Sequence, residues 1–438
     1  MRVKIDNKIK GIISRDRKTM STTTREHYPF VASHGSGDFI YDVSGNKFVD
    51  FSTFIGVYTL GVNGIPEIRK AVKDQVDKLM HPAFTDFYSE LPVTFSEKLL
   101  TMFPKHFNKV FLSNSGTEAN EDAIKLSRVF TKKQYLIAFY NAFHGRTMGS
   151  LGLTASKVVQ REYFGPFNAV VHTPYPYEYR WKDPDSCATD CIDHIKKTIF
   201  AKEVSPKEVA AIFIEPIQGE GGYIVPPIQF MKELRELASE HDILLVSDEV
   251  QAGYMKTGKF LALDNFGINA DIYTMAKALG GGLPIGATVY KEALGEMQQG
   301  SHANTFGGNL ISVAAANASL DYVKKNMSSL QRMTKQKGAY IMKRLNQMKE
   351  DYEIVGDVRG IGMMIGVELV KNKHTKDPAI KERSMVIEEC FSNGLLLLPC
   401  GVSTIRIIPP ITIEQKNLEN GMNILEAGIR NANREQKH

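Results

Sequence analysis

The chain has 438 residues, of which 43% are hydrophobic and 24% are charged, as is typical of a globular protein with a sizeable core. Its formal net charge of +5 is small for this length, and its basic residues are scattered. A nucleic-acid-binding protein would need a concentrated basic face, so we expect no nucleic-acid partner. No apolar run is long enough to cross a membrane and the N-terminus lacks a signal-peptide core, so we expect a cytoplasmic protein without membrane contact.

The four cysteines predict neither a zinc site nor a disulfide framework. Cys187 and Cys191 are four residues apart, which suits neighbouring turns of a helix better than the usual spacing of zinc ligands, and no second pair completes a site. We therefore expect no bound metal and a reducing compartment.

The first part of the chain predicts little regular structure. Residues 1 to about 35 are polar and are expected to be irregular. Residues 37–50 predict a hairpin with its turn at 44–46. A helix is predicted to begin near Pro66, because proline favours the first helical turn and an apolar stripe follows it.

The middle of the chain alternates between predicted strands and helices. The apolar runs that predict strands are 110–112, 135–139, 210–214, 244–246, 271–276 and 285–290. This alternation indicates a mostly parallel sheet covered on both faces. From about residue 315 the pattern changes to a long amphipathic helix at roughly 312–350 and short strands at 363–368, 395–398 and 405–408, which predicts a small α+β region.

Two charged residues follow neighbouring predicted strands. Asp248 comes directly after the run 244–246, and Lys277 ends the run 271–276 and precedes three glycines at 280–282. Ligands of open α/β sheets bind at the carboxyl ends of the strands. Pyridoxal phosphate (PLP) needs a lysine amine for its covalent link and an acid opposite its ring nitrogen. Either residue alone would more simply be a turn former or a surface charge, but together they predict a PLP site.

Three loops could complete such a site. Ser113–Thr117 is a strand-to-helix turn whose backbone amides could bind phosphate, although an ordinary helix cap explains it equally well. In the loop at 143–146, Phe143 could cover a planar ring and Arg146 could bind a carboxylate; a packed aromatic and a surface arginine are the simpler alternative. The glycines around Glu220 predict tight or mobile backbone.

Two glycine-rich segments do not fit nucleotide sites. Residues 253–259 have the spacing of a P-loop, but Phe260 stands where a magnesium-binding hydroxyl is needed. Residues 360–362 resemble part of a dinucleotide fingerprint, but they lead into a strand-like run. We predict that both contain ordinary turn glycines.

With these segments in place, the chain resembles the class III aminotransferases of the fold-type I PLP group. The resemblance is carried by blocks that span most of the chain: Ser113–Ala119, Phe143–Thr147, Ile214–Gly222, Ser247–Gln251, Met275–Gly282 and Asn304–Asn309. It implies an α/β fold with a large, mostly parallel-sheet cofactor domain over residues 60–315. Residues 1–59 and 316–438 would form the small α+β domain.

The resemblance also implies a role for each matching residue. Lys277 would form the Schiff base and move the substrate proton, while Asp248 would keep the ring nitrogen protonated. Thr305 would reach the phosphate of the neighbouring subunit, so the enzyme would be a homodimer with shared active sites. The remaining cofactor-binding residues would be Ser115, Gly116, Thr117, Phe143, His144, Glu215, Val250 and Gln251.

Among these enzymes the chain is most similar to the 4-aminobutyrate aminotransferases. Arg146 would bind the carboxylate of a substrate with a distal amine, and Arg406 would bind the α-carboxylate of glutamate or 2-oxoglutarate. Glu220 would pair with Arg406 for the first substrate and move away for the second, and Ile55 would also contact substrate. The chain departs from the expected pattern at three positions, Val62, Ala252 and Lys256.

The expected reaction is a ping-pong transfer of an amino group from a small-molecule amine to a 2-oxo acid. Ornithine, acetylornithine or lysine are alternative donors. A PLP-dependent amino-acid racemase or epimerase on the same scaffold is also open, because it would use the same Lys277 and Asp248. A phosphate- or nucleotide-binding protein without PLP is a further alternative, which Phe260 disfavours.

Overall fold

The structure is a computed structural model that describes residues 2–21, 28–167, 169–295 and 297–436. The chain divides into two compact units. The larger unit contains residues 65–332, and the smaller unit combines residues 1–64 with residues 333–438. Both ends of the chain therefore contribute to the smaller unit.

The larger unit is built on a sheet with the strand order β4-β10-β9-β8-β7-β5-β6. The strands are β4 (Lys109–Ser113), β5 (Tyr135–Phe139), β6 (Val170–Thr173), β7 (Val209–Ile214), β8 (Leu244–Asp248), β9 (Ile272–Met275) and β10 (Gly286–Tyr290). β10 pairs antiparallel with both of its neighbours, whereas the pairs from β9 to β6 are parallel. The prediction of a mostly parallel sheet is confirmed, although β6 was not among the predicted strands.

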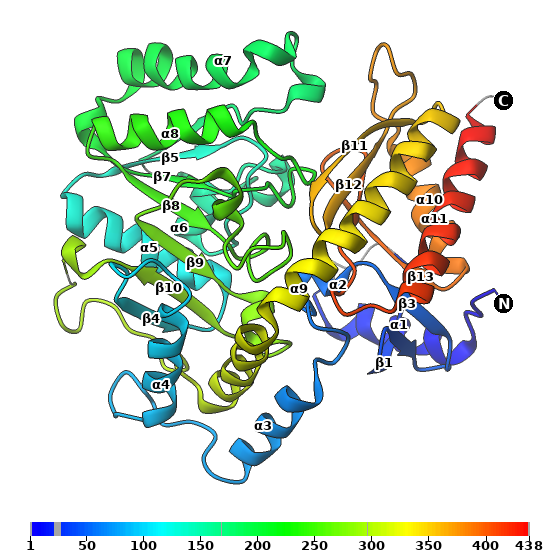
Figure 1. The fold of residues 1–438 in the computed structure, drawn as a ribbon, viewed down its shortest axis with the longest axis horizontal. Helices are drawn as coiled ribbons and strands as arrows, with labels where there is room; N and C mark the ends of the chain where they lie inside the picture. Colours follow the sequence, from blue (N-terminus) through cyan, green and yellow to red (C-terminus); the bar gives the residue numbers. More distant parts are fainter. Residues whose placement is uncertain (1, 22–27, 168, 296, 437–438) are drawn as a thin grey trace. The chain divides into compact units, whose positions relative to one another are not determined.

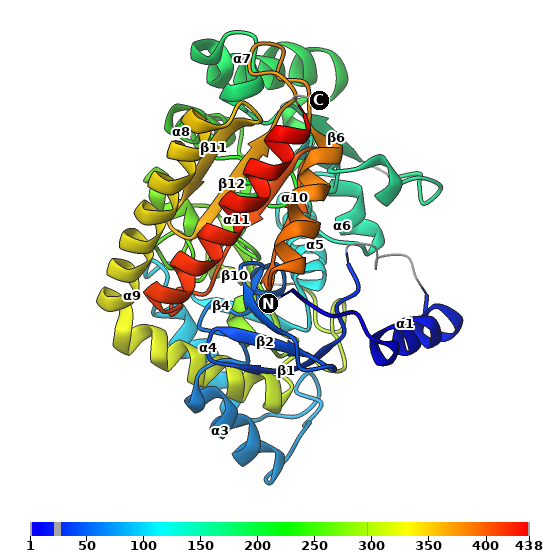
Figure 2. The same ribbon diagram turned by 90° about the vertical axis from the view of Figure 1, so that its right-hand side faces the viewer.

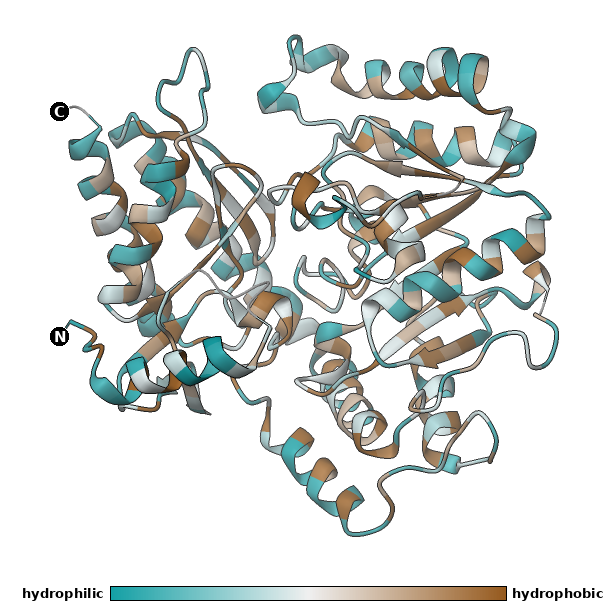
Figure 3. Ribbon diagram, turned by 180° about the vertical axis from the view of Figure 1, so that it is seen from behind, coloured by the Kyte–Doolittle hydropathy of each residue, from teal (hydrophilic) through white to brown (hydrophobic). Residues whose placement is uncertain are grey.

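The larger unit also contains helices, not all of which pack on this sheet (Figure 1). They are α3 (Pro66–Val76), α4 (Glu90–Leu100), α5 (Gly116–Thr131), α6 (Met148–Leu153), α7 (Cys187–His194) and α8 (Ile228–Glu240). α5 packs against β4 and β7 to β10, and α8 packs against β8. Every residue of β7 is buried, so both faces of this strand are covered. Hydrophobic residues colour much of the sheet brown in Figure 3.

Side chains from α5 and four parallel strands form the core of the larger unit. Its fully buried members include Ala123, Leu126, Leu136, Phe213, Val246 and Ile272. α5 is thus fixed against the strands whose carboxyl ends carry the predicted site residues.

The smaller unit contains two sheets, ordered β1-β2-β3-β13 and β11-β12-β15-β14. The strands of the first are β1 (Ala32–Ser36), β2 (Phe39–Asp42), β3 (Lys47–Asp50) and β13 (Leu395–Leu396), and those of the second are β11 (Val355–Ile361), β12 (Met364–Leu369), β14 (Leu398–Cys400) and β15 (Thr404–Ile407). The predicted hairpin is the antiparallel pair β2–β3. Because β13 pairs with β3, the two ends of the chain share one sheet.

The helices of the smaller unit are α1 (Asn7–Thr19), α2 (Thr53–Gly56), α10 (Ile380–Ser392) and α11 (Gln415–Glu435). α10 and α11 pack against one another, as Figure 2 shows. The long helix α9 (Leu310–Asp351) contains the boundary between the units and departs from helical geometry at Asn326.

The expectation of irregular structure over residues 1–35 was wrong where α1 and β1 lie, and part of that range, residues 1 and 22–27, lies outside the described residues. Asp6 is the N-cap of α1, and its carboxylate accepts a hydrogen bond from the backbone N–H of Ile9 at 3.0 Å. Ile9 is the only fully buried residue of α1, and Ile12 and Ile13, three and four positions later, are half-buried; this short apolar stripe was missed in the sequence. No helix among the described residues has the length and apolar character needed to cross a membrane.

Turns occur in both of the rejected nucleotide motifs. Gly360 lies in β11, and Gly362 lies in the turn to β12 with a φ of +61°. Residues 250–257, which follow β8, form consecutive turns rather than a strand-to-helix loop.

Candidate active site

Asp248 is the last residue of β8 and is only 4% exposed. Its Oδ2 accepts hydrogen bonds from Asn120 Nδ2 and His144 Nδ1, both at 2.8 Å, and its Oδ1 accepts one from the backbone N–H of Val250 at 3.0 Å. A buried carboxylate is stable only where hydrogen bonds replace water. These three bonds therefore support a buried negative charge at the end of the strand.

Asn120 connects several elements to Asp248. Its Oδ1 accepts a hydrogen bond from Thr274 Oγ1 on β9 at 2.9 Å, and its Nδ2 also donates to the carbonyl of His144 at 2.7 Å. One side chain of α5 thereby fixes β8, β9 and the loop after β5. Asn120 was not predicted as a site residue. Its position could have indicated a role, because it is a polar residue on the buried face of α5, three positions before Ala123.

His144 and Glu215 form the buried surroundings of this carboxylate. Burial opposes a charge on His144, but the hydrogen bond and charge of Asp248, together with the charge of Glu215, outweigh it and raise the pKa of His144. Burial raises the pKa of Glu215 to about 7. Glu215 accepts hydrogen bonds from the backbone N–H groups of Phe143 and Gly219, both at 3.0 Å, so it holds two loops of the site.

Lys277 follows the adjacent strand, β9, and is half-buried. β8 and β9 pair in parallel, with Asp248 opposite Thr274. Asp248 and Lys277 therefore emerge at the same edge of the sheet, as the sequence predicted. Lys277 has a φ of +46°, a left-handed conformation that is uncommon outside glycine and that often marks functional positions.

The first turn of α5 lies against the loop after β5. Ser115 is the N-cap, and its Oγ accepts a hydrogen bond from the backbone N–H of Glu118 at 3.3 Å. A Cβ on Gly116 would lie 2.7 Å from Val250 Cγ1, so glycine lets Val250 approach the turn. Thr117 Oγ1 accepts hydrogen bonds from the backbone N–H groups of Arg146 and Thr147 at 3.2 and 3.3 Å. The unpaired amides of such a helix start can bind a phosphate group.

Arg146 is exposed, and its guanidinium carbon lies 5.3 Å from the centre of the Phe143 ring. It forms no ion pair within the described part of the chain. Gln251 is buried and accepts a hydrogen bond from the Tyr223 hydroxyl at 2.9 Å. Glu220 is half-buried in the adjoining turn, where the N–H of Gly222 donates to the carbonyl of Gly219 at 3.2 Å.

Two predicted substrate residues lie in the smaller unit. Arg406 in β15 is 3% exposed, and its Nε and Nη2 donate to the carbonyl of Pro399 at 3.1 and 2.8 Å. Ile55 in α2 is 43% exposed and has a φ of +67°. In the larger unit, Thr305 is exposed beside Asn304, whose Nδ2 donates to the carbonyl of Leu112 at 3.1 Å.

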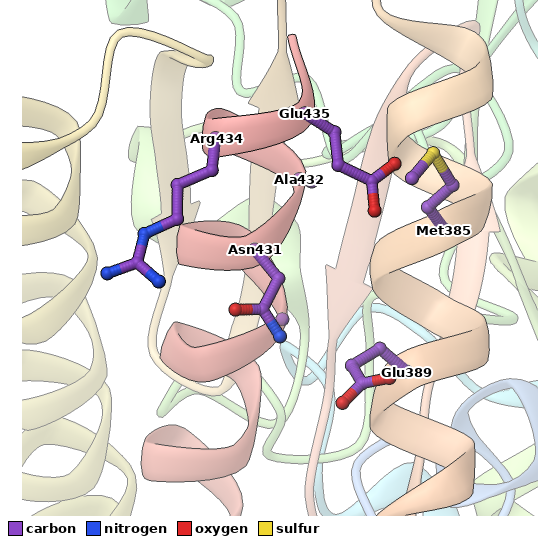
Figure 4. Close-up of a pocket in the computed structure, with 7 residues that line it drawn as sticks. Met385, Glu389, Asn431, Ala432, Arg434 and Glu435 are labelled. Atoms are coloured by element: carbon purple, nitrogen blue, oxygen red, sulfur yellow. The ribbon is translucent and has the colours of Figure 1, made fainter. Parts of the chain in front are cut away.

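The smaller unit also has a surface groove of about 310 Å³ between α10 and α11 (Figure 4). It is lined by Met385, Glu389, Gly428, Asn431, Ala432, Arg434 and Glu435. None of the predicted site residues lines it.

The groups at the edge of the large sheet fit PLP. A buried, hydrogen-bonded carboxylate suits a protonated ring nitrogen, a lysine at the next strand end suits the covalent link, and the start of α5 suits the phosphate. Among the described residues, no cluster of His, Cys, Asp and Glu side chains could hold a metal ion.

Comparisons with known proteins agree with this chemistry. The family model for class-III aminotransferases matches residues 20–429. The leucine/methionine racemase of Thermococcus litoralis is 37% identical over 95% of this chain and 95% of its own length. The "Probable 4-aminobutyrate aminotransferase" of Bacillus subtilis is 33% identical over 91% and 93%. A PLP-bound amine transaminase from an uncultivated Pseudomonas species superposes with a TM-score of 0.87, at 28% identity over 94% and 98% of the two chains.

The fold and the site thus define a PLP-dependent enzyme of fold type I. More narrowly, the chain belongs to the class III aminotransferases.

Proposed function

We propose that this enzyme transfers the amino group of an ω-amino acid, such as 4-aminobutyrate, to 2-oxoglutarate in a ping-pong reaction. The observation that carries the proposal is Arg146, an exposed arginine without an ion-pair partner in the described part of the chain. Its backbone is fixed to Thr117, and it lies two residues from His144, which holds Asp248. Such a guanidinium is suited to bind the carboxylate of a substrate whose amine is at the other end.

The bound cofactor supplies an electron sink. Lys277 would hold it covalently and, once released, move a proton from the reacting substrate carbon. Asp248 would keep the ring nitrogen protonated, with His144 and Asn120 holding the carboxylate in place. Val250 and Phe143 would contact the two faces of the ring, Gln251 its phenolic oxygen, and Ser115, Gly116 and Thr117 its phosphate.

Two further residues would let one pocket serve both substrates. Arg406 would bind the α-carboxylate of the 2-oxo acid, and Glu220 would neutralise Arg406 while the ω-amino acid is bound. Glycines on both sides of Glu220 give its loop the backbone freedom that this exchange needs. Ile55 would contact the substrate. The proposed domains are a cofactor domain over residues 60–315 and a small domain formed by residues 1–59 with 316–438.

We also propose a homodimer in the cytoplasm. An apolar patch is defined here by Met80, Phe87 and Tyr88 together with Phe306, which are 56%, 67%, 101% and 57% exposed. The two segments meet beside Thr305: Thr85 Oγ1 donates to the carbonyl of Asn304 at 3.4 Å, and the rings of His81 and Phe306 lie 4.7 Å apart. Exposed apolar residues gathered in this way mark interfaces, and a second copy would bring its Thr305 to the shared site. The four buried free cysteines support a reducing compartment.

The test is the first half-reaction. PLP-loaded enzyme is mixed with 4-aminobutyrate alone, and the visible absorption of the lysine-bound cofactor is followed. The proposal expects this band to disappear and to return when 2-oxoglutarate is added. If the absorption does not change when 4-aminobutyrate is added, this compound is excluded as the donor, and ornithine, acetylornithine and lysine would be tested next.

An amino-acid racemase is the second candidate, because two proteins named as racemases, at 37% and 35% identity, match nearly the whole chain. A racemase would return the proton to the substrate carbon. In deuterium oxide without any 2-oxo acid, it would exchange the α-hydrogen of a single enantiomer and invert that carbon. Inversion without a stoichiometric amine acceptor would exclude the aminotransferase proposal.

A further inference from the structure

The short segment that follows β3 turns in the left-handed sense. Thr53, Phe54, Ile55 and Gly56 have φ values of +44°, +49°, +67° and +81°. In such a turn the Cβ of an L-residue lies too close to the following carbonyl oxygen, so consecutive residues other than glycine are disfavoured. β-branched and bulky side chains make the conformation rarer still. Strain of this kind persists only where the surrounding structure holds it, and it is concentrated at functional sites.

A buried carboxylate holds the start of this turn. Asp50, the last residue of β3, is fully buried. Its Oδ1 accepts hydrogen bonds from the backbone N–H and the hydroxyl of Ser52, both at 2.7 Å, and from the N–H of Thr53 at 3.0 Å. Ser52 Oγ in turn accepts one from the N–H of Phe54 at 3.2 Å. Burial raises the pKa of Asp50 to about 6, so above that pH Oδ1 is a charged and therefore stronger acceptor.

The residue after Asp50 is fixed to the end of β15, the strand that carries Arg406. The N–H of Phe51 donates to the carbonyl of Leu396 at 3.0 Å. The carbonyl of Phe51 accepts a hydrogen bond at 2.9 Å from the N–H of Ile408, two residues beyond Arg406. The left-handed turn and Arg406 thus belong to one hydrogen-bonded framework within the smaller unit.

Two consecutive side chains of the turn have different surroundings. Phe54 packs against the core of the smaller unit that includes Phe48 and Leu396, and its ring lies edge-on to Tyr58 at 5.7 Å. Ile55, the next residue, is 43% exposed. An exposed isoleucine is ordinary by itself. One that is held out of the core by a disfavoured backbone conformation is suited to contact a ligand.

We propose that Asp50 is a positioning residue for the substrate: its carboxylate holds the left-handed turn that presents Ile55, on the same framework as Arg406, to the apolar carbon chain of the substrate. The inference rests on the proposed function, in which Ile55 and Arg406 contact the substrate. Without the hydrogen bonds to Oδ1 the turn would relax, and substrate binding would have to restore it. The apparent affinity then falls with the fraction of molecules that hold the turn, whereas the bound complex reacts at nearly the same rate.

The experiment measures KM and the limiting rate of both half-reactions, with 4-aminobutyrate and with 2-oxoglutarate, for PLP-loaded variants at about pH 8, above the pKa of Asp50. Asp50→Ala removes the acceptor, whereas Asp50→Asn keeps an oxygen in its place. Asp42→Ala is the matched control, because Asp42 is 2% exposed in the same sheet and its Oδ1 accepts hydrogen bonds from the N–H groups of Ser44 and Asn46, both at 2.9 Å. Urea titration and the visible spectrum report the stability and the cofactor link of each variant.

Asp50→Ala should raise KM about 10-fold or more and change the limiting rate by less than about twofold, with an unchanged visible spectrum. Asp50→Asn should restore KM to within about threefold of the unchanged enzyme, because one carbonyl oxygen can accept the same three bonds. Asp42→Ala should lower the urea midpoint and leave KM unchanged. Ile55→Ala should raise KM, and adding Asp50→Ala to it should have little further effect, because both changes act through one side chain.

Three results would overturn the role of Asp50: an unchanged KM in Asp50→Ala, a lower limiting rate at unchanged KM, or effects of Asp50→Ala and Ile55→Ala that simply add. If Asp50→Ala does not fold, Ser52→Ala replaces it, since it removes the hydroxyl between Asp50 and the N–H of Phe54, and the same results decide. If the unchanged enzyme does not respond to 4-aminobutyrate, the proposed donor fails. The same comparison is then made with the donor or the amino-acid enantiomer that the enzyme accepts, so the two failures are distinct.

Discussion

Replacing His144 with Phe tests whether the network around Asp248 serves the chemistry. His144 Nδ1 donates one of the three hydrogen bonds to the buried carboxylate, and the ring packs edge-on against Phe213, where a phenyl ring can also fit. A hydrogen bond to a charged group contributes about 1.5–3 kcal/mol. If Asp248 needs its full charge to hold the ring-nitrogen proton in the transition state, the rate falls about 10- to 100-fold.

The assay is exchange of the reacting C–H of the amino donor with deuterium oxide, because both aminotransferase and racemase need this step. His172→Phe is the matched control: His172 is a largely buried histidine on β6 that contacts the carbonyl of Leu153 at 3.2 Å and makes no hydrogen bond to Asp248. It should exchange at the rate of the unchanged enzyme. An unchanged rate in PLP-loaded His144→Phe would refute the reasoning.

Three further predictions follow from named contacts. Gly145→Ala should lower the free energy of unfolding by about 1–3 kcal/mol in urea titrations, because its Cβ would lie 2.1 Å from Thr117 Oγ1 and its φ is +141°. In the control Gly11→Ala, in α1, the added Cβ meets nothing within 4 Å, so this variant should be slightly more stable. Burial raises the pKa of Asp122 to about 7, so the folded enzyme keeps a proton that the unfolded chain releases, and the free energy of unfolding falls from pH 4 to 7. Asp122→Asn should remove up to about 4 kcal/mol of that fall. Plots of unfolding free energy against pH that run parallel for the variant and the unchanged enzyme would contradict this. Tyr88→Asp should convert a dimer to a monomer in sedimentation, while Tyr163→Asp, at an equally exposed tyrosine outside the apolar patch, should not.

The parts of the fold that the sequence predicted are those with strong local signals. β7 and β8 are short apolar runs with polar boundaries, and Pro66 marks the start of α3 by its own geometry. Asp248 and Lys277 could be placed together because the carboxyl ends of parallel strands share an edge. β6 lacked such a signal, because no residue of it before Thr173 is fully buried. α1 carried one that was missed, an N-cap at Asp6 followed by Ile9, Ile12 and Ile13 at helical spacing.

Contacts between distant segments could not be read in the same way. β13 has two residues and exists because it pairs with β3, more than 340 positions earlier in the chain. Asn120 acquires its role only when α5 packs over β8 and β9. The burial of Lys256 is the clearest case, since a lysine among turn residues is normally solvated and its burial depends on tertiary packing.

The two buried charged groups at this sheet edge have opposite environments, and the contrast suggests how the enzyme sets their charges. Asp248 receives three hydrogen bonds, so its negative charge is supported without water. Lys256 receives none from the described residues and is repelled by Lys277, so its positive charge is easily given up. In the proposed function, the proton that Lys277 would move passes between a substrate carbon and an amine that must be neutral to receive it. An acid at position 248 that stays charged without water would support that transfer, because it would keep the ring nitrogen protonated.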